Sequence, residues 1–168
     1  MQLPTLSDGR VLLRAAEPRD VPAIEAGIHD PDVIRWIGPQ LPTAQDVLRQ
    51  SEERWSQGSP TLSICTLDGT CVGKIWLSVS ETERSTGSIG YWLLPAGRGR
   101  GLATSAVRLL SIWAVDELGV TNLRITTAPD NAQSQRVAER SGYQRVSQTA
   151  DEVVFVRPAV RPPPSSGR

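Results

Sequence analysis

The amino-acid sequence predicts an α+β (α/β) fold in which helices cover one central sheet. Three observations support this prediction: strand-like runs that form an antiparallel meander before residue 94, a glycine-rich loop that opens an amphipathic helix, and a strand–helix–strand unit after that helix. The 168 residues, 39% of them hydrophobic and 21% charged, suffice for one substantial core. We expect one domain over residues 1–157 and a disordered, proline- and serine-rich tail over residues 158–168.

Helices and strands alternate in the N-terminal half of the chain. Apolar periodicity and capping residues predict helices over Arg19–Ile28, Asp32–Ile37 and Ala44–Gln57. Alternating runs rich in β-branched residues predict strands over Arg10–Ala15, Thr61–Thr66 and Cys71–Ser80. The turn signal Asp68-Gly69 joins the last two strands into a hairpin, so we expect an antiparallel meander here.

A glycine-rich loop follows the next strand. Ser88–Leu94 is apolar and stops at Pro95, which indicates a buried strand, and the loop is Arg98-Gly99-Arg100-Gly101-Leu102-Ala103. Its glycines let successive amide N–H groups converge on a ligand, and its arginines add positive charge. The helix that begins in this loop and ends at Leu118-Gly119 presents unpaired N–H groups at its N-terminus, where an anion is favoured. The loop is therefore a candidate polyphosphate site.

A solvated glycine-rich turn is the alternative interpretation, and the loop alone does not decide between the two. The glycine spacing does not fit a dinucleotide fingerprint, and a Walker loop would need a lysine that is absent. Further along, Leu123–Thr127 alternates like a strand, and a helix from Asn131 ends at Gly142. A final strand pair is predicted over Tyr143–Ser147 and Glu152–Arg157.

With this order of elements, the sequence resembles the GNAT-type acyl-CoA N-acyltransferases. The central motif of that family is Arg or Gln, two residues, Gly, one residue, and then Gly or Ala; Arg98, Gly101 and Ala103 match it. The resemblance is strongest over Ser88–Tyr143 and is nearest to the branch of ribosomal-protein N-terminal acetyltransferases. It implies a mixed, mostly antiparallel twisted sheet of about six to seven strands with about four flanking helices.

The later motif of the family is an Asn, a Ser three residues on, and a helix that closes in Gly-Tyr or Gly-Phe. Asn131, Ser134, Gly142 and Tyr143 match it. By resemblance Ser134 lies near the thioester sulfur as a donor or acid, and Tyr143 is a second catalytic candidate. Helix capping by Asn131, a merely small side chain at Ser134 and core packing of Tyr143 are the structural alternatives.

The resemblance also implies acetyl-CoA as co-substrate, without a metal. The residues expected to bind it are Trp92, Leu93, Leu94, Arg98, Gly99, Arg100, Gly101, Leu102, Ala103, Asn131 and Ser134. The backbone of the strand at Trp92–Leu94 would hold the pantetheine arm and polarise the acyl carbonyl. We expect acceptor contacts from Trp36 and Trp92, although each could instead pack in the core.

Two departures from the family limit the mechanism. Ala138 stands where many members carry a tyrosine acid, and Ser88 stands where relatives carry an acidic residue. The candidates for a general base are acidic residues near strand ends or near the later motif: Glu81, Glu83, Asp130 and Glu152. Each of them could instead be a solvated charge on the surface.

We expect an N-acetyltransferase acting on a primary amine of a protein N-terminus, a peptide or a small molecule. One alternative is transfer of a longer acyl group such as succinyl, which would need a roomier pocket and a basic contact. Another is a non-catalytic acyl-CoA-binding regulatory domain, suggested by the missing tyrosine and acid. Cofactor binding alone would not separate these alternatives.

Amino-acid composition limits the binding partners and the cellular location that we expect for this protein. The net charge is zero, so neither nucleic acid nor an anionic membrane is expected as a partner. No targeting signal is evident, and we expect a cytoplasmic monomer or homodimer. Cys65 and Cys71 are expected to be reduced structural thiols. His29, the single histidine, is expected to cap a helix or to make a surface contact rather than to act in catalysis, and a lone histidine argues against zinc.

Overall fold

The computed structural model describes residues 3–39 and 42–158. Its helices are η1 (Pro18–Asp20), α1 (Val21–Ile28), α2 (Pro31–Ile37), α3 (Ala44–Ser56), η2 (Pro95–Gly97), α4 (Leu102–Leu118) and α5 (Ala132–Arg140). Its strands are β1 (Leu6–Ser7), β2 (Leu12–Arg14), β3 (Thr61–Cys65), β4 (Cys71–Val79), β5 (Thr86–Leu93), β6 (Asn122–Thr127), β7 (Gln144–Gln148) and β8 (Val153–Val156). Each predicted helix and strand is present, with ends shifted by a few residues.

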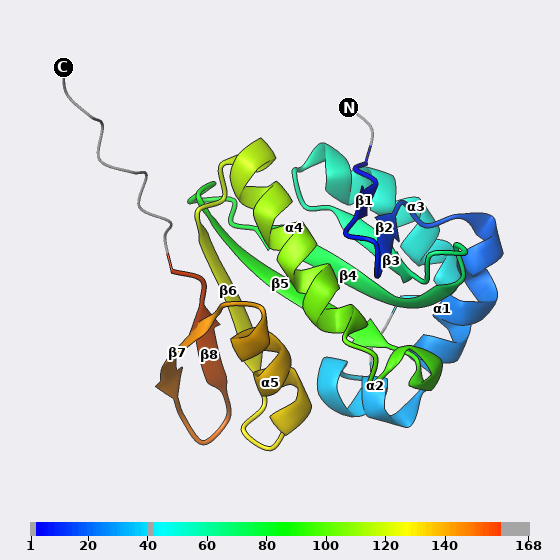
Figure 1. The fold of residues 1–168 in the computed structure, drawn as a ribbon. Helices are drawn as coiled ribbons and strands as arrows, with labels where there is room; N and C mark the ends of the chain where they lie inside the picture. Colours follow the sequence, from blue (N-terminus) through cyan, green and yellow to red (C-terminus); the bar gives the residue numbers. More distant parts are fainter. Residues whose placement is uncertain (1–2, 40–41, 159–168) are drawn as a thin grey trace.

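The strands form one sheet with the order β1-β2-β3-β4-β5-β6-β8-β7 (Figure 1). All neighbours are antiparallel except β5 and β6, which are parallel. The mixed, mostly antiparallel sheet is confirmed, but it has eight strands rather than six or seven. The unexpected strand, β1, has only two residues, too few to produce an alternating pattern.

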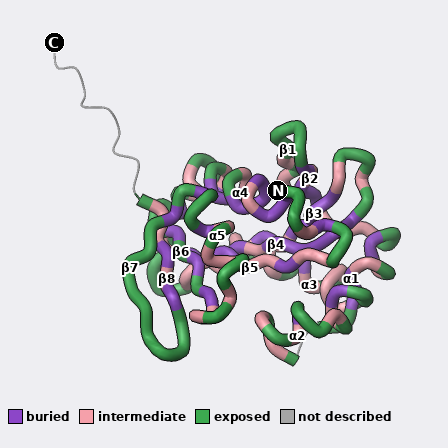
Figure 2. Tube along the Cα trace, turned by 60° about the horizontal axis from the view of Figure 1, so that its bottom comes forward, coloured by how far each residue is buried: buried purple, intermediate pink, exposed green. Residues whose placement is uncertain are grey.

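Helices cover both faces of this sheet. On the face under α4, Ile75 and Leu77 are fully buried and share one core cluster with Leu110 and Phe155. Alternation along β4 turns Trp76 to the opposite face, which α1 and α3 cover. Burial follows this arrangement: Figure 2 shows buried stretches along β4, β5 and α4 and an exposed turn between β7 and β8.

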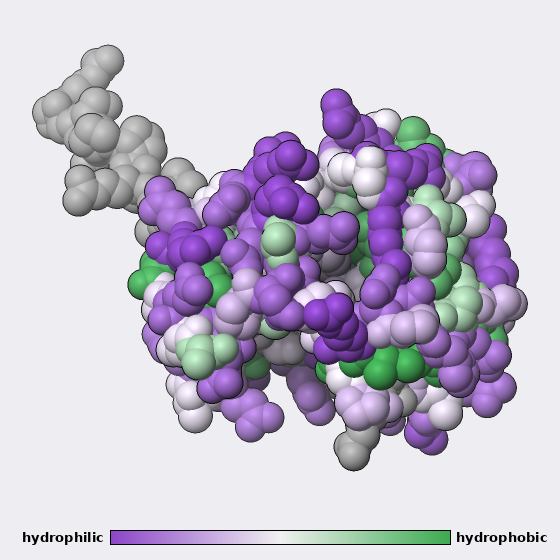
Figure 3. Space-filling view, turned by 90° about the horizontal axis from the view of Figure 1, so that it is seen from below, coloured by the Kyte–Doolittle hydropathy of each residue, from purple (hydrophilic) through white to green (hydrophobic). Residues whose placement is uncertain are grey.

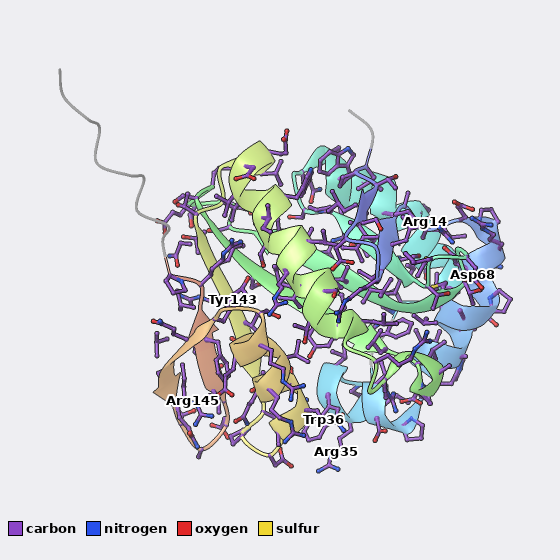
Figure 4. All side chains as sticks on the ribbon, in the orientation of Figure 1. Arg14, Arg35, Trp36, Asp68, Tyr143 and Arg145 are labelled. Carbon is purple, nitrogen blue, oxygen red and sulfur yellow. The ribbon has the colours of Figure 1, made fainter. Side chains whose placement is uncertain are left out.

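A buried ion pair fastens α1 to the sheet. The Arg14 guanidinium at the end of β2 donates to both Asp20 oxygens, Nη1 to Oδ2 at 2.7 Å and Nη2 to Oδ1 at 2.9 Å. Asp20 also accepts from the Glu17 N–H and the Ser63 hydroxyl, each at 3.0 Å. Arg14 donates further to the Gly69 carbonyl in the β3–β4 turn, and Figure 4 shows Arg14 at that end of the molecule, near Asp68.

The hydrogen bonds to Asp20 set its ionisation. Burial alone would raise the pKa of Asp20, but the donors from Arg14, Glu17 and Ser63 outweigh burial and lower the pKa. The carboxylate therefore stabilises the fold at neutral pH, and this contribution is lost as the pH falls through the lowered pKa.

The two parallel strands stay together only at their N-terminal ends. Their register is Thr86 with Asn122, Gly87 with Leu123 and Ser88 with Arg124, and it ends there. Beyond that point β5 remains paired with β4, while β6 remains paired with β8. The sheet therefore opens like a wedge between β5 and β6.

The last described residue is Pro158, and the single domain expected over residues 1–157 stays a prediction. The predicted disordered tail lies, from residue 159 on, outside the described residues, and its predicted disorder remains an expectation. Within the described ranges, no helix is long and apolar enough to cross a membrane.

The Arg14–Asp20 pair gives a stability prediction. Asp20→Asn should cost about 3 kcal/mol of unfolding free energy, because it removes the buried counter-ion of Arg14 and leaves only the half-exposed Glu17 carboxylate, 3.5 Å away. Glu139→Gln, which breaks an exposed 3.7 Å contact to Arg145, is the matched control and should cost less than about 1 kcal/mol. Urea unfolding at pH 7 measures both, and equal losses would contradict the assigned role of the buried pair.

Candidate functional site

The wedge between β5 and β6 opens into a cleft of about 650 Å³. Its walls come from β5, β6, the loop before α4 and the first turn of that helix, α5, and one side of α2. Figure 3 looks onto this end of the molecule, where the surface has a central recess bordered by hydrophilic residues. Of the predicted site residues, these line the cleft: Trp36, Trp92, Leu93, Arg98, Gly99, Gly101, Leu102, Ala103, Asn131 and Ser134.

The loop before α4 has the backbone of an anion site. Gly99 and Gly101 adopt φ of 70° and 73°, a left-handed conformation that glycine adopts without strain. Gly101 is also the N-cap of α4, and no side chain caps that helix end. The first N–H groups of a 17-residue helix therefore face the cleft, where the helix dipole favours negative charge.

The Arg98 side chain lies in a different environment from the one the sequence suggested. Its Nε donates to the Leu93 carbonyl at 2.9 Å, and its Nη1 and Nη2 contact Asp32 at 2.9 Å and Asp30 at 2.8 Å. The guanidinium thus ties the end of β5 to the N-terminus of α2. Arg100 is exposed, and its contact with the Ala96 carbonyl is long, at 3.4 Å. It is therefore the arginine of the loop whose charge is least neutralised.

Asn131 and Ser134 lie at the start of α5, facing β5. Asn131 Oδ1 accepts from the Ser134 N–H at 3.1 Å, so Asn131 caps the helix as the structural alternative expected. The Ser134 hydroxyl accepts from the Tyr91 hydroxyl at 3.3 Å across the cleft. Burial raises the pKa of Tyr91, so that its proton stays in place at neutral pH.

No role for Tyr91 is predicted from the sequence. Alternation along β5 places it on the same face as Ile89 and Leu93, and the departure of β6 turns that face toward α5. The missed signal was the end of strand pairing, which a single sequence does not show. Two basic residues one turn apart on α5, Arg136 and Arg140, also line the cleft and were not singled out.

Three predicted site residues do not line the cleft: Leu94, Arg100 and Tyr143. The Leu94 N–H donates to the Val72 carbonyl at 2.8 Å, which commits it to β4. Tyr143 is 3% exposed and its hydroxyl lies 2.7 Å from that of Ser111 in the core. Figure 4 shows Tyr143 well away from Trp36, so its contacts favour the packing interpretation.

Trp36 and Trp92 occupy different walls. Trp36 is half-buried on α2 beside the cleft, with the Arg35 guanidinium 4.3 Å from its ring (Figure 4). Trp92 is 7% exposed, and its ring packs directly on Gly27 of α1, where a Cβ would collide with it. Trp36 therefore presents part of its ring to the cleft, whereas most of Trp92 packs against α1.

Only Asp130 among the four candidate bases lines the cleft, and it pairs with Arg35 at 3.0 Å. Glu81, Glu83 and Glu152 are exposed in turns. His29 is the C-cap of α1, with Nδ1 2.8 Å from the Glu25 carbonyl. Cys65 and Cys71 lie opposite each other on β3 and β4 as buried, free thiols. No cluster of metal-binding side chains occurs in the described part of the chain.

Comparison with known proteins identifies the family. The model of the acetyltransferase (GNAT) domain matches residues 10–144. The chain therefore belongs to the GNAT acetyltransferase family, and the resemblance stated from the two motifs is confirmed.

Individual relatives are more distant. The "Putative ribosomal N-acetyltransferase YdaF" of Bacillus subtilis is 34% identical over 76 residues, which cover 45% of this chain and 42% of that protein. The "N-acetyltransferase 9-like protein" of Caenorhabditis briggsae is 24% identical over 145 residues, 78% of this chain and 73% of that protein. The chain thus spans less than half the length of the Bacillus relative.

Solved structures share the fold over nearly the whole chain. An acetyltransferase from Agrobacterium tumefaciens str. C58 has a TM-score of 0.76 and 27% identity, covering 93% of this chain and 95% of that one. The ribosomal L7/L12 alpha-N-protein acetyltransferase RimL, solved with coenzyme A, has a TM-score of 0.78 and 17% identity, covering 92% and 97%. At 17% identity the second likeness shows the fold alone.

The contacts of the two loop arginines predict different effects of mutation. Arg98→Ala should lower the unfolding free energy by about 1–2 kcal/mol, since it breaks partly buried ion pairs with Asp30 and Asp32. Arg100→Ala should leave stability unchanged and weaken coenzyme A binding by up to about tenfold, because Arg100 lies outside the cleft lining and would add its charge from the rim. Urea unfolding and calorimetric titration with coenzyme A measure the two effects. Unchanged stability of Arg98→Ala would contradict its structural role.

Proposed function

We propose that this chain is an N-acetyltransferase that moves the acetyl group of acetyl-CoA to a primary amine. The observation that carries the proposal is the cleft itself, which joins the uncapped N-terminus of α4 to the Tyr91–Ser134 pair. Structural neighbours support the donor, since RimL was solved with coenzyme A and the self-immunity acetyltransferase MccE with acetyl-CoA and AMP.

Two elements would bind acetyl-CoA: the loop before α4 would bind its pyrophosphate, and β5 would bind its pantetheine arm. The pyrophosphate would lie on the backbone N–H groups of Gly99–Ala103, with Arg100 adding charge from the rim. The pantetheine arm would run along the edge of β5 at Trp92 and Leu93, where strand pairing with β6 has ended. Asn131 would contribute its amide Nδ2, because Oδ1 is already used as the cap of α5.

Transfer of an acetyl group from a thioester to an amine has three requirements at this site. The acceptor must attack as a neutral amine, the carbonyl oxygen must be stabilised as it gains charge, and the departing thiolate must gain a proton. A new C–N bond forms, the C–S bond breaks, and the proton lost by the amine leaves through water or Asp130. The unpaired backbone of β5 supplies donors for the carbonyl oxygen.

Ser134 would protonate the thiolate. Tyr91 donates to the Ser134 oxygen, so it would stabilise the charge that develops there as the Ser134 proton moves to the sulfur, and the proton lost by the amine, relayed through water, would restore the Ser134 hydroxyl. This pair would take the place of the family tyrosine, which is Ala138 in this chain. Tyr143, the other catalytic candidate, lies in the core and has no part in this mechanism.

The acceptor class follows from the relatives. Similarity to proteins named ribosomal N-acetyltransferases favours a peptide or protein N-terminus, presented past Trp36, in the cytoplasm. A monomer or a homodimer would serve equally well, because the cleft is built from one chain.

The activity is tested by thiol release. Mixing the protein with acetyl-CoA and a panel of N-terminal peptides and small amines should release coenzyme A in an acceptor-dependent manner, with product mass increased by one acetyl group. Tight coenzyme A binding with silence across the whole panel would instead support a non-catalytic acyl-CoA-binding domain. Faster release from succinyl-CoA than from acetyl-CoA would support transfer of the longer acyl group.

The Tyr91–Ser134 pair predicts a split between turnover and binding. Ser134→Ala should lower kcat about 100-fold and change the Kd for acetyl-CoA less than about threefold, because the hydroxyl acts on the leaving group. Tyr91→Phe should give a smaller loss of kcat, about tenfold, for a single hydrogen bond. Ser111→Ala, a buried hydroxyl outside the cleft, is the control. Equal losses in kcat and affinity would assign Ser134 to binding.

A further inference from the structure

A second cavity, of about 140 Å³, lies on the face of the sheet opposite α4. It is bounded by α1, by α3 and by the side chains that β3, β4 and β5 present on this face of the sheet. Most of its lining is aliphatic or aromatic. Two residues, Ile37 and Trp92, line both this cavity and the cleft, so the cavity adjoins the region where acyl transfer would occur. Pockets that enclose a whole ligand usually measure roughly 300–1,000 Å³, so this one fits a single side chain or one end of a reactant.

Two cations line this cavity. Lys74 is 2% exposed, and its Nζ has no hydrogen-bond partner among the described residues. Arg54, on α3, is half-buried and contacts only the Ser78 hydroxyl, at 3.2 Å, among described partners. Burial lowers the pKa of Arg54. The described lining contains no carboxylate.

The carboxylate of Asp20, in the polar row beside Lys74, is already hydrogen-bonded by other groups. Asp20 accepts four hydrogen bonds from Arg14, Glu17 and Ser63, two of them from the Arg14 guanidinium. In the sheet register, Ser63 lies directly between Arg14 and Lys74, so Lys74 is the next residue of this polar row and lacks a counter-ion of its own. A buried ammonium without a partner is costly, and proteins retain such groups at binding sites.

Burial lowers the pKa of Lys74 to about 8 from the ordinary 10.5, although Cys71, Asp20 and Cys65 act against it and Arg14 acts with it. At neutral pH most of the amine is still protonated. A carboxylate placed in the cavity would therefore meet a positive charge that the fold has left unpaired.

We propose that Lys74, assisted by Arg54, binds a carboxylate of one of the reactants in this cavity. The carboxylate belongs either to an acidic acceptor, such as a peptide with Asp or Glu near its N-terminus, or to a dicarboxylic acyl donor such as succinyl-CoA. Because Trp92 lines both spaces, the carboxylate would lie on one side of it and the acyl carbonyl on the other, and the aliphatic walls would take the intervening methylene groups. This proposal rests on the proposed acyl transfer, and it adds that the protein selects a reactant that carries a carboxylate.

Matched reactants that differ in one charge test the proposal. Peptide acceptors with Asp or Glu at their first three positions are compared with the same peptides carrying Asn or Gln, and succinyl-CoA is compared with butyryl-CoA. We expect kcat/KM to favour the acid in one of the two series by about tenfold or more, as for one charge-assisted hydrogen bond. Lys74→Met should reduce that ratio to near one, and the exposed Arg49→Met on the same helix as Arg54 should leave it unchanged.

A second measurement does not depend on turnover. With ¹⁵N-labelled lysine, succinate should shift the Lys74 Nζ signal and raise its pKa, and neutral succinamide should do neither. Equal rates for acid and neutral reactants in both series, together with no response to succinate, would overturn the carboxylate site. Silence with every acceptor, together with a succinate response, would overturn the proposed acyl transfer and leave the carboxylate site standing.

Discussion

The rest of the site depends on where the parallel strands β5 and β6 stop pairing. A sheet normally satisfies the backbone groups of each strand with those of its neighbours, and here the ladder ends at Ser88 and Arg124. Everything attributed to the site lies past that point: the free edge of β5, the N-terminus of α4, the cap of α5 and the wall of α2. The antiparallel partners of each strand keep the wedge from closing, because β4 holds β5 and β8 holds β6.

Sequence reasoning located the elements well because local signals define them. Gly119 ends α4 in a left-handed conformation, and Asp68-Gly69 turns the β3–β4 hairpin, as their residue types predict. The family motifs located the loop and the start of α5 for the same reason. The short β1 escaped detection because only its pairing with β2 makes it a strand.

Side-chain assignments were less accessible, since they depend on contacts between distant segments. Arg98 matches the family motif, yet its charge is used on Asp30 and Asp32, more than sixty residues earlier in the chain. Tyr91 meets Ser134 across 43 positions, and Lys74 becomes noteworthy only when its neighbours on every side are known. Contacts between residues so far apart in the sequence leave no periodic pattern from which they could be predicted.

The contacts of Arg98 have a kinetic meaning. The same guanidinium contacts the end of β5 and the first turn of α2, and α2 carries Trp36, which lines the cleft. The loop before α4 and the start of α2 are therefore linked by one side chain. We expect a cofactor that orders the loop to order the start of α2 as well, so that binding of the donor would prepare the cleft for the amine.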